Sequence, residues 1–196
     1  TLPLAFAQAI DPESISLRVY WIQAFAGIID LAGLWGFWKC LESLSKKIQL
    51  SLTLQHLALA CAILAWFAVT DAIRPSGEHL SSVALWVSLG LLVKQKHLSS
   101  GLIAVLIGAF RYPSGLLSVG ILTAVILSSI QKRKPHLALR FSAGVALGLV
   151  IWGIPDWIFY GQPWKSLWMY LQYNVFTDLS SRPVSYTHLR AHETQR

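Results

Sequence analysis

Charged residues are scarce in this chain of 196 residues. They make up 13% of it, about half the share in ordinary soluble domains. Hydrophobic residues make up 55% and come in long runs, which excludes a disordered chain and argues against a soluble fold. The two cysteines, Cys40 and Cys61, have no CxxC or Cys/His spacing, so neither a disulfide framework nor a zinc site is indicated.

Common catalytic motifs are absent as well. The sequence has no Gly-rich phosphate loop, no GxSxG, no HExxH and no EF-hand pattern. Its net charge of +7 lies in short clusters between apolar runs, which fits membrane topology better than nucleic-acid binding. Small residues recur within the runs, as in AGVALG at 143–148, and favour close helix packing over a cofactor site.

Both ends of the chain differ from its body. Met169 is the only methionine, so Thr1 is not a natural initiator and we expect a fragment or a processed chain. From Val184 the sequence resembles a translated sequencing adapter. We therefore interpret 183–196 as a non-native tail and 1–182 as a fragment of one membrane domain. His188 and His192 lie in this tail and are not interpreted as a metal site.

Six apolar runs predict an all-α, polytopic transmembrane bundle. The third and fourth runs are short for a membrane span. They would form a tilted hairpin, a re-entrant pair or helices buried by their neighbours, and the sequence does not choose among these. The runs are Tyr20–Trp38, Leu50–Thr70, His79–Val93, Leu98–Phe110, Pro113–Ile130 and Leu137–Trp152.

Basic clusters alternate with loops that contain few lysines or arginines. The clusters follow the first, third and fifth runs: Lys39, Lys46 and Lys47; Lys94 and Lys96; Lys132, Arg133 and Lys134. The positive-inside rule places these loops in the cytoplasm, so we expect six crossings, with the intervening loops and the segment after Pro155 on the opposite side. That side also holds most acidic residues: Asp11, Glu13, Asp71, Glu78, Asp156 and Asp178.

Three charged residues in or beside the apolar runs are functional candidates. Arg74, in the loop TDAIRPSGEHL, is suited to bind a phosphate with its planar fork, or it forms a local ion pair with Asp71 or Glu78. Arg111, in GAFRYPSGLL, lines a polar cavity or snorkels to the interface. Asp30, in the first run, faces a substrate pathway, or it is a protonated or amide-paired packing residue.

The segment after the sixth run is rich in tryptophan and tyrosine. Its sequence from Gly153 is GIPDWIFYGQPWKSLWMYLQYNVFTDLSSR. Aromatic side chains at this density suit the headgroup boundary, and they equally suit contacts with lipid tails or sugars. The apolar spacing between Lys165 and Phe176 predicts an interfacial helix.

The order of these motifs resembles the lipid-phosphosugar-dependent mannosyltransferases, in particular the family of the GPI-anchor and N-glycan-precursor enzymes. The resemblance runs from about Leu17 to Arg182. Arg74, Ser76 and Glu78 match a loop pattern of the family, and Arg111 with Pro113 matches a weaker one. The strongest match comprises Asp156, Phe159, Tyr160, Gly161, Tyr173, Asn174, Ser180 and Ser181.

The resemblance implies an inverting, GT-C-type membrane glycosyltransferase. Its donor would be dolichyl- or polyprenyl-phosphate mannose and its acceptor a glycan or glycolipid, on the luminal face of the endoplasmic reticulum or the periplasmic face of a bacterial inner membrane. No metal, other cofactor or nucleic-acid partner is implied. Arg74 and Arg111 would contact the donor phosphate. The further substrate-side residues would be Glu78, Asp156, Tyr160 and Asn174.

The family also carries a catalytic acid in a His-Pro-Asp-Glu-like outer loop. The resemblance places this acid before Thr1, so we expect the fragment alone to be inactive. A multi-pass transporter or flippase with Asp30 on its pathway is the alternative function, and a non-catalytic scaffold is a third. Upstream sequence discriminates among them, because an acidic outer loop favours the enzyme and repeated hydropathy halves favour a transporter.

Overall fold

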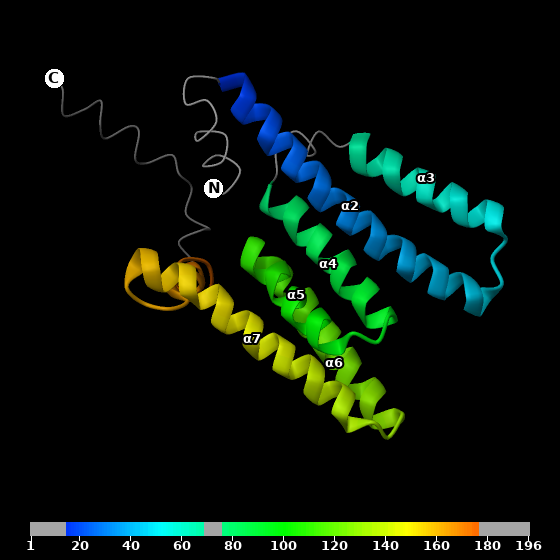
Figure 1. Cartoon of the computed structure of the whole chain (residues 1–196). Helices are drawn as coiled ribbons and strands as arrows, with labels where there is room; N and C mark the ends of the chain where they lie inside the picture. The colour runs from blue at the N-terminus through cyan, green and yellow to red at the C-terminus, as the bar shows by residue number, and fades with distance from the viewer. Residues whose placement is uncertain (1–14, 69–75, 177–196) are drawn as a thin grey trace. The chain divides into compact units, whose positions relative to one another are not determined.

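The computed structural model describes residues 15–68 and 76–176, and within them the side chains of 19–61 and 76–176 (Figure 1). Every regular element in these ranges is helical, which confirms the all-α prediction. Helices satisfy their backbone polar groups internally, as lipid requires. The elements are α2 (Ile15–Ile48), α3 (Leu52–Ala68), α4 (Gly77–Val93), α5 (His97–Phe110), η2 (Tyr112–Ser114), α6 (Gly115–Gln131), α7 (Pro135–Tyr160), α8 (Lys165–Leu171) and η3 (Gln172–Phe176).

The helices fall into two length classes. In the described part of the chain, three segments are long and apolar enough to cross a membrane: Val19–Ile48, Tyr112–Gln131 and Pro135–Tyr160. With 17 and 14 residues, α4 and α5 are shorter than the roughly 20 residues of a perpendicular span. Both carry many buried residues. Of the alternatives for the third and fourth runs, burial by neighbouring helices fits best, and the count of six crossings stays a prediction.

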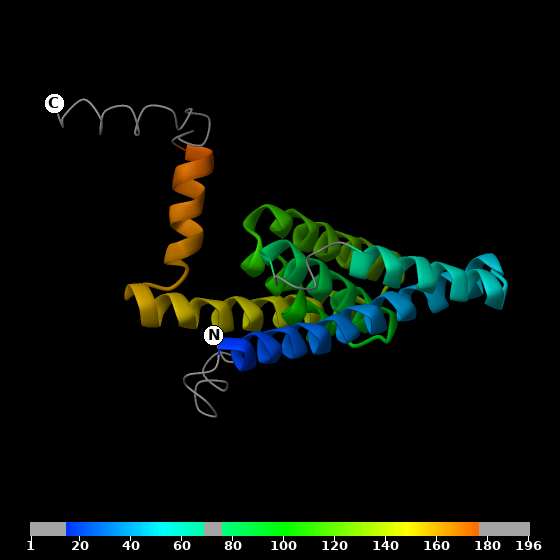
Figure 2. The same cartoon turned by 90° about the horizontal axis from the view of Figure 1, so that it is seen from above.

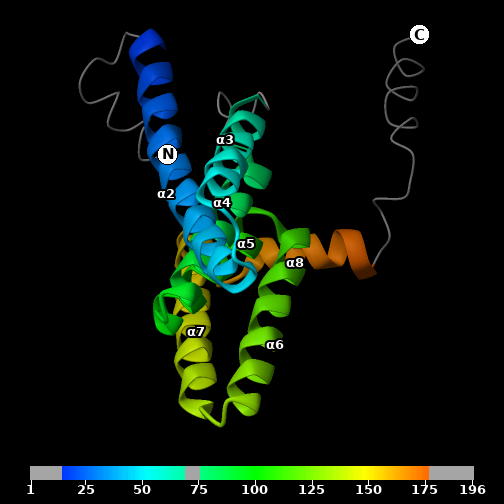
Figure 3. The same cartoon turned by 90° about the vertical axis from the view of Figure 1, so that its right-hand side faces the viewer.

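The chain divides into two compact units, Thr1–Ile151 and Trp152–Arg196, with the division inside α7. In the first unit, α4 lies between α2 and α5, with which it makes the most extensive helix contacts (Figure 1). Within the same unit, α6 and the first part of α7 diverge from a common turn (Figure 3). In the second unit, α8 turns sharply away from the last turns of α7 (Figure 2).

Three helix ends in the first unit share one hydrogen-bond pattern. Gln49, Gln95 and Arg133 have positive φ angles of 53°, 59° and 54°. After each of them, the next backbone N–H donates to a carbonyl five residues back, as in Lys96 to Leu91 at 2.9 Å. This is the Schellman ending, and it satisfies helix carbonyls that would otherwise lack a donor. The lysine-rich loops are therefore short, ordered turns.

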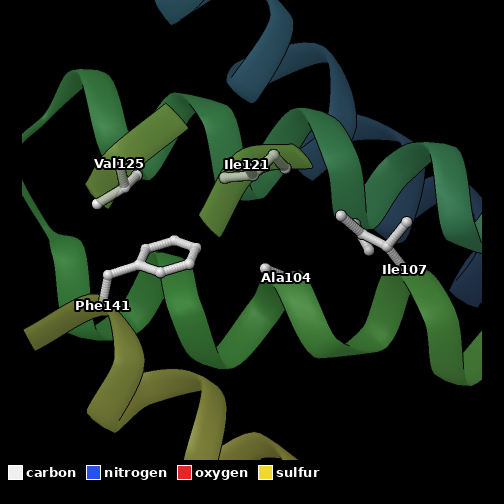
Figure 4. Close-up of a cluster of buried hydrophobic side chains, with 6 residues drawn as sticks. Ala104, Ile107, Ile121, Val125 and Phe141 are labelled. Atoms are coloured by element: carbon white, nitrogen blue, oxygen red, sulfur yellow. The ribbon is translucent and has the colours of Figure 1, made fainter. Parts of the chain in front are cut away.

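The core of the first unit surrounds α5. Figure 4 shows Ile121 and Val125 of α6 and Phe141 of α7 beside Ala104 and Ile107 of α5. Ala104, Ile107 and Phe141 are 0% exposed. The short α5 is thus enclosed by α4, α6 and α7, which explains how a 14-residue helix is accommodated.

Buried serines join α4 to α5. The Ser88 hydroxyl donates to the Ser100 carbonyl oxygen at 3.1 Å, and the Ser100 hydroxyl donates to the Ser88 carbonyl oxygen at 2.7 Å. Nearer the other end of α4, the Ser81 hydroxyl donates to the Ile107 carbonyl oxygen at 2.9 Å. Small hydroxyl side chains let two membrane helices approach closely and hydrogen-bond across their interface.

Glycine provides the close approach of α5 to α7. A Cβ added at Gly101 would collide with the Phe141 carbonyl oxygen, and one added at Gly144 would collide with the Leu98 carbonyl oxygen. Gly144 belongs to the AGVALG segment, so the expectation that this segment serves close helix packing is confirmed. A Cβ at Gly120, by contrast, would meet nothing within 4 Å.

Replacing Gly144 with alanine is therefore expected to destabilise the first unit by about 1–3 kcal/mol, the usual cost of overpacking. The Gly120→Ala variant adds the same methyl group into open space and serves as the matched control. Unfolding of both variants is compared in detergent micelles. Equal stability of the two would contradict the close α5–α7 packing.

The basic turns gather at one end of the first unit. Helices α2 and α4 run side by side in the same direction, and Lys94 lies 5.9 Å from the centre of the Trp35 ring (Figure 1). At the start of α5, the His97 ring is within electrostatic reach of Arg140 and Lys132. We call this the lysine-rich end, defined by the 94–96 and 132–134 turns. The side of the membrane that these turns face stays a prediction.

Candidate functional site

The end of the first unit opposite the lysine-rich end carries an ion pair between two predicted site residues. Arg111 follows the last residue of α5, and Glu78 lies in the first turn of α4. Arg111 Nη2 lies 2.7 Å from Glu78 Oε1. Both side chains are about half exposed, so the pair itself contributes little stability. We call this region the Glu78–Arg111 end.

A second, buried pair lies next to the first. His79 Nε2 is 2.5 Å from Asp30 Oδ1, and the two side chains are 5% and 2% exposed. Asp30 comes from the middle of α2, and His79 from the start of α4. The carboxylate is thus engaged by an imidazole across the helix interface. Of the two expectations for Asp30, the buried contact fits a packing residue better than a pathway residue, with an imidazole instead of an amide as its partner.

Glu78 and His79 are neighbours at the start of α4, and they contact different partners. Ser76 is the N-cap, and its hydroxyl accepts a hydrogen bond from the His79 backbone N–H at 3.1 Å. Successive helical residues point roughly 100° apart, so Glu78 reaches outward to Arg111 while His79 reaches inward to Asp30. A Cβ at Gly77 would collide with the Phe110 carbonyl oxygen, which shows how closely the α4 start approaches the α5 end.

The structure thus brings Glu78 and Arg111 together. The Arg111 guanidinium is paired with a carboxylate from another helix, and the two interpretations of Arg111, a polar cavity or snorkelling to the interface, stay predictions. Arg74 lies outside the described residues. Glu78 forms an ion pair with Arg111, and the pair considered between Arg74 and Asp71 or Glu78 stays a prediction.

Asp156 is a structural acceptor in the second unit. Its Oδ2 accepts from the Ser166 backbone N–H at 2.8 Å and from the Ser166 hydroxyl at 2.6 Å. Asp156 is 7% exposed, and Ser166 lies in the first turn of α8. A carboxylate here satisfies an N–H at the helix start and ties α8 to the end of α7.

Replacing Asp156 with alanine is expected to free the first turn of α8, since two hydrogen bonds to one carboxylate oxygen are lost. Loss of such a cap costs about 1 kcal/mol. Hydrogen exchange at the amides of 165–171 should accelerate several-fold in Asp156→Ala and less in Ser166→Ala, which keeps the backbone donor. Unchanged exchange in Asp156→Ala would show that this carboxylate does not hold α8.

The other two predicted residues of the second unit are more accessible. Tyr160, the last residue of α7, is 57% exposed. Asn174 lies in the π-helical turn η3, where its Nδ2 donates to the Tyr170 carbonyl oxygen at 3.0 Å. The predicted helix between Lys165 and Phe176 is present as α8 and η3. Tyr160 therefore offers its ring to a ligand more readily than Asn174 offers its amide.

Sequence reasoning missed His79. Two signals could have found it: a buried carboxylate in a membrane helix requires a partner, and His79 begins an apolar run directly after Glu78. The separation of 49 positions from Asp30 leaves no local periodicity that would link the two. Among the described residues, no group of three or more His, Cys, Asp or Glu residues could hold a metal ion.

The apolar helices define a helical membrane protein. In its first unit, two pairs of charged or polar side chains lie at the start of α4: Glu78 with Arg111, and His79 with Asp30. Comparison with protein families gives a definite assignment. The model of the Alg9-like mannosyltransferase family matches residues 1–186, and the chain belongs to this family. The family suspected from the motif order is thereby confirmed, and it is one of membrane glycosyltransferases. Comparisons with curated proteins and with solved structures give no match.

Proposed function

We propose that this protein transfers mannose from a polyprenyl- or dolichyl-phosphate donor to a hydroxyl of a glycan or glycolipid. Family membership supports mannosyl transfer in general. The observation that supports a lipid-phosphate donor is Arg111, a half-exposed arginine at a helix end, held in place by Glu78. An arginine at a membrane boundary binds a phosphate strongly, because its hydrogen bonds are less screened there than in bulk water.

In the proposed reaction the acceptor hydroxyl oxygen attacks C1 of the donor mannose. The bond between C1 and the phosphate oxygen breaks with its electron pair, the new glycosidic bond forms with inversion, and the hydroxyl proton passes to a general base. Negative charge then grows on the leaving phosphate. Arg111, and Arg74 with it, would stabilise that charge, and Glu78 would keep Arg111 oriented between turnovers.

The second unit is proposed to shape the acceptor side. Asp156 would act indirectly, since its carboxylate already holds Ser166. Tyr160 would contact the acceptor through its exposed ring, and Asn174 would brace the turn that follows α8. Transfer is proposed to occur on the side of the membrane opposite the lysine-rich turns, in the endoplasmic reticulum or a bacterial inner membrane.

The test uses membranes containing the protein expressed with any coding sequence upstream of Thr1. They are supplied with dolichyl-phosphate [³H]mannose or with GDP-[³H]mannose, after endogenous dolichyl-phosphate mannose synthesis has been blocked. We expect label in a glycan or glycolipid only from the lipid-phosphate donor. Label that crosses sealed vesicles without forming a new glycosidic bond would instead indicate a transporter.

A further inference from the structure

A cavity of about 500 Å³ lies in the first unit, and its wall runs along α6 from Leu116 and Leu117 to Lys132. Its walls are mostly apolar and come from one face each of α4 and α6. Its polar residues concentrate where it reaches the lysine-rich end, at Gln95, His97 and Lys132. The apolar wall residues include Leu85, Leu89, Leu92, Leu117, Gly120 and Ala124. An elongated apolar cavity with a cationic end matches an amphiphile with an anionic head.

His97 provides independent evidence for a ligand at that end. The residue is 9% exposed, and its Nε2 lies 3.3 Å from Gln95 Oε1. Because an amide oxygen only accepts, Nε2 carries the hydrogen and Nδ1 of the neutral ring is an acceptor. Nδ1 is buried and has no hydrogen-bond partner among the described residues. A buried acceptor without a donor is costly, so a ligand hydroxyl is the natural partner.

The charges around His97 point to an anion beside that hydroxyl. Lys132 lines the cavity together with His97, and the ring is also within electrostatic reach of Arg140. The acidic side chains described in the first unit are engaged elsewhere: Asp30 with His79, Glu42 with Lys39 and Lys46, and Glu78 with Arg111. Within the described residues, the cationic charge at the mouth of the cavity therefore has no carboxylate to compensate it.

We propose that this cavity binds an anionic phospholipid whose headgroup carries a free hydroxyl, from the leaflet that faces the lysine-rich turns. One acyl chain lies along the leucines of α4, where it contacts an apolar wall. The phosphate lies near Lys132, and the headgroup hydroxyl donates to His97 Nδ1. The position proposed for the headgroup is separate from the proposed donor site, because it lies at the lysine-rich end of α4 and α5.

The test is native mass spectrometry of the purified, delipidated protein with three lipids of equal acyl chains. These are phosphatidylglycerol, phosphatidic acid and phosphatidylcholine. We expect phosphatidylglycerol to bind most tightly, phosphatidic acid next and phosphatidylcholine least. Lys132→Ala should weaken both anionic lipids about fivefold, the effect of one basic residue near a lipid phosphate. His97→Leu should remove the preference for phosphatidylglycerol over phosphatidic acid and keep the preference for anionic lipids.

Matched variants separate this site from general attraction to basic loops. Gly120→Leu fills the cavity without changing charge and should abolish lipid retention, whereas Gly27→Leu, where an added Cβ also meets open space, should not. Lys47→Ala removes an exposed lysine outside the cavity and should leave affinity unchanged. If Gly120→Leu is recovered poorly, Lys132→Ala and His97→Leu decide the question.

Four results would overturn the proposal. The first is equal retention of the three lipids, and the second is an equal effect of Lys47→Ala and Lys132→Ala. The third is displacement of the bound species by inorganic phosphate alone, which would show an anion site without a lipid. A Gly120→Leu variant that loses a dimer rather than a lipid would likewise overturn it, because a second copy of the chain would then occupy the cavity.

Discussion

Replacing Arg111 with alanine is expected to lower mannosyl transfer from a lipid-phosphate donor by about 100- to 1,000-fold. This is the usual loss when one positioned donor to a developing charge is removed. Folding should be nearly unaffected, because the half-exposed pair with Glu78 contributes little stability. Transfer is measured under saturating acceptor in membranes with matched amounts of protein. Arg111→Lys should be intermediate, since it keeps the charge and loses the planar fork.

The control for this experiment is Arg133→Ala. Arg133 is an exposed arginine in the turn between α6 and α7, at the lysine-rich end. The substitution removes the same charge and leaves the Glu78–Arg111 end intact. Equal losses in Arg111→Ala and Arg133→Ala would show that arginines support only insertion or expression, and the proposed donor site would then be abandoned.

The second large effect is expected on stability. Asp30→Ala leaves His79 buried without its carboxylate, and breaking a buried pair on one side costs about 3–5 kcal/mol. The folded fraction after detergent extraction and the unfolding midpoint should both fall. Asp30→Asn should be milder, because an amide oxygen still accepts a hydrogen bond from the ring.

A double variant tests whether the stability lost in Asp30→Ala comes from leaving one polar partner buried alone. Asp30→Leu combined with His79→Leu replaces both partners with apolar groups, which in other proteins is often neutral or stabilising. We expect the double variant to recover most of the stability lost in Asp30→Ala. A double variant less stable than either single variant would mean that the pair has no specific role in joining α2 to α4.

The helices could be predicted from the sequence because each apolar run specifies its own backbone hydrogen bonds in lipid. The run from Tyr20 to Trp38 extends in the structure to Ile15–Ile48, and the last run continues through Pro155 to Tyr160. These extensions were not predictable from hydropathy, because the added residues mix charged and polar side chains with the apolar ones. Pro155 lacks the N–H that would otherwise donate to the carbonyl oxygen four residues earlier, so α7 loses one hydrogen bond there and still continues to Tyr160.

The candidate site was predicted in part. Charge placement and motif order predict Glu78 and Arg111 as site residues, and the structure adds that the two side chains contact each other. Asp30 was singled out as an ionisable residue in a membrane run, yet its partner His79 was not found. Pairings between helices depend on packing registers set by residues such as Gly36 and Gly90, and no single run contains that information.

The claim that the donor phosphate binds at the Glu78–Arg111 end is tested most directly by photo-crosslinking. A dolichyl-phosphate mannose analogue with a photoreactive group beside the phosphate is irradiated with the protein in membranes, and the modified peptides are mapped. We predict modification within 76–79 and 110–114, lost on competition with unlabelled donor. Competable modification confined to 94–97 and 128–137, at the lysine-rich end, would contradict the account.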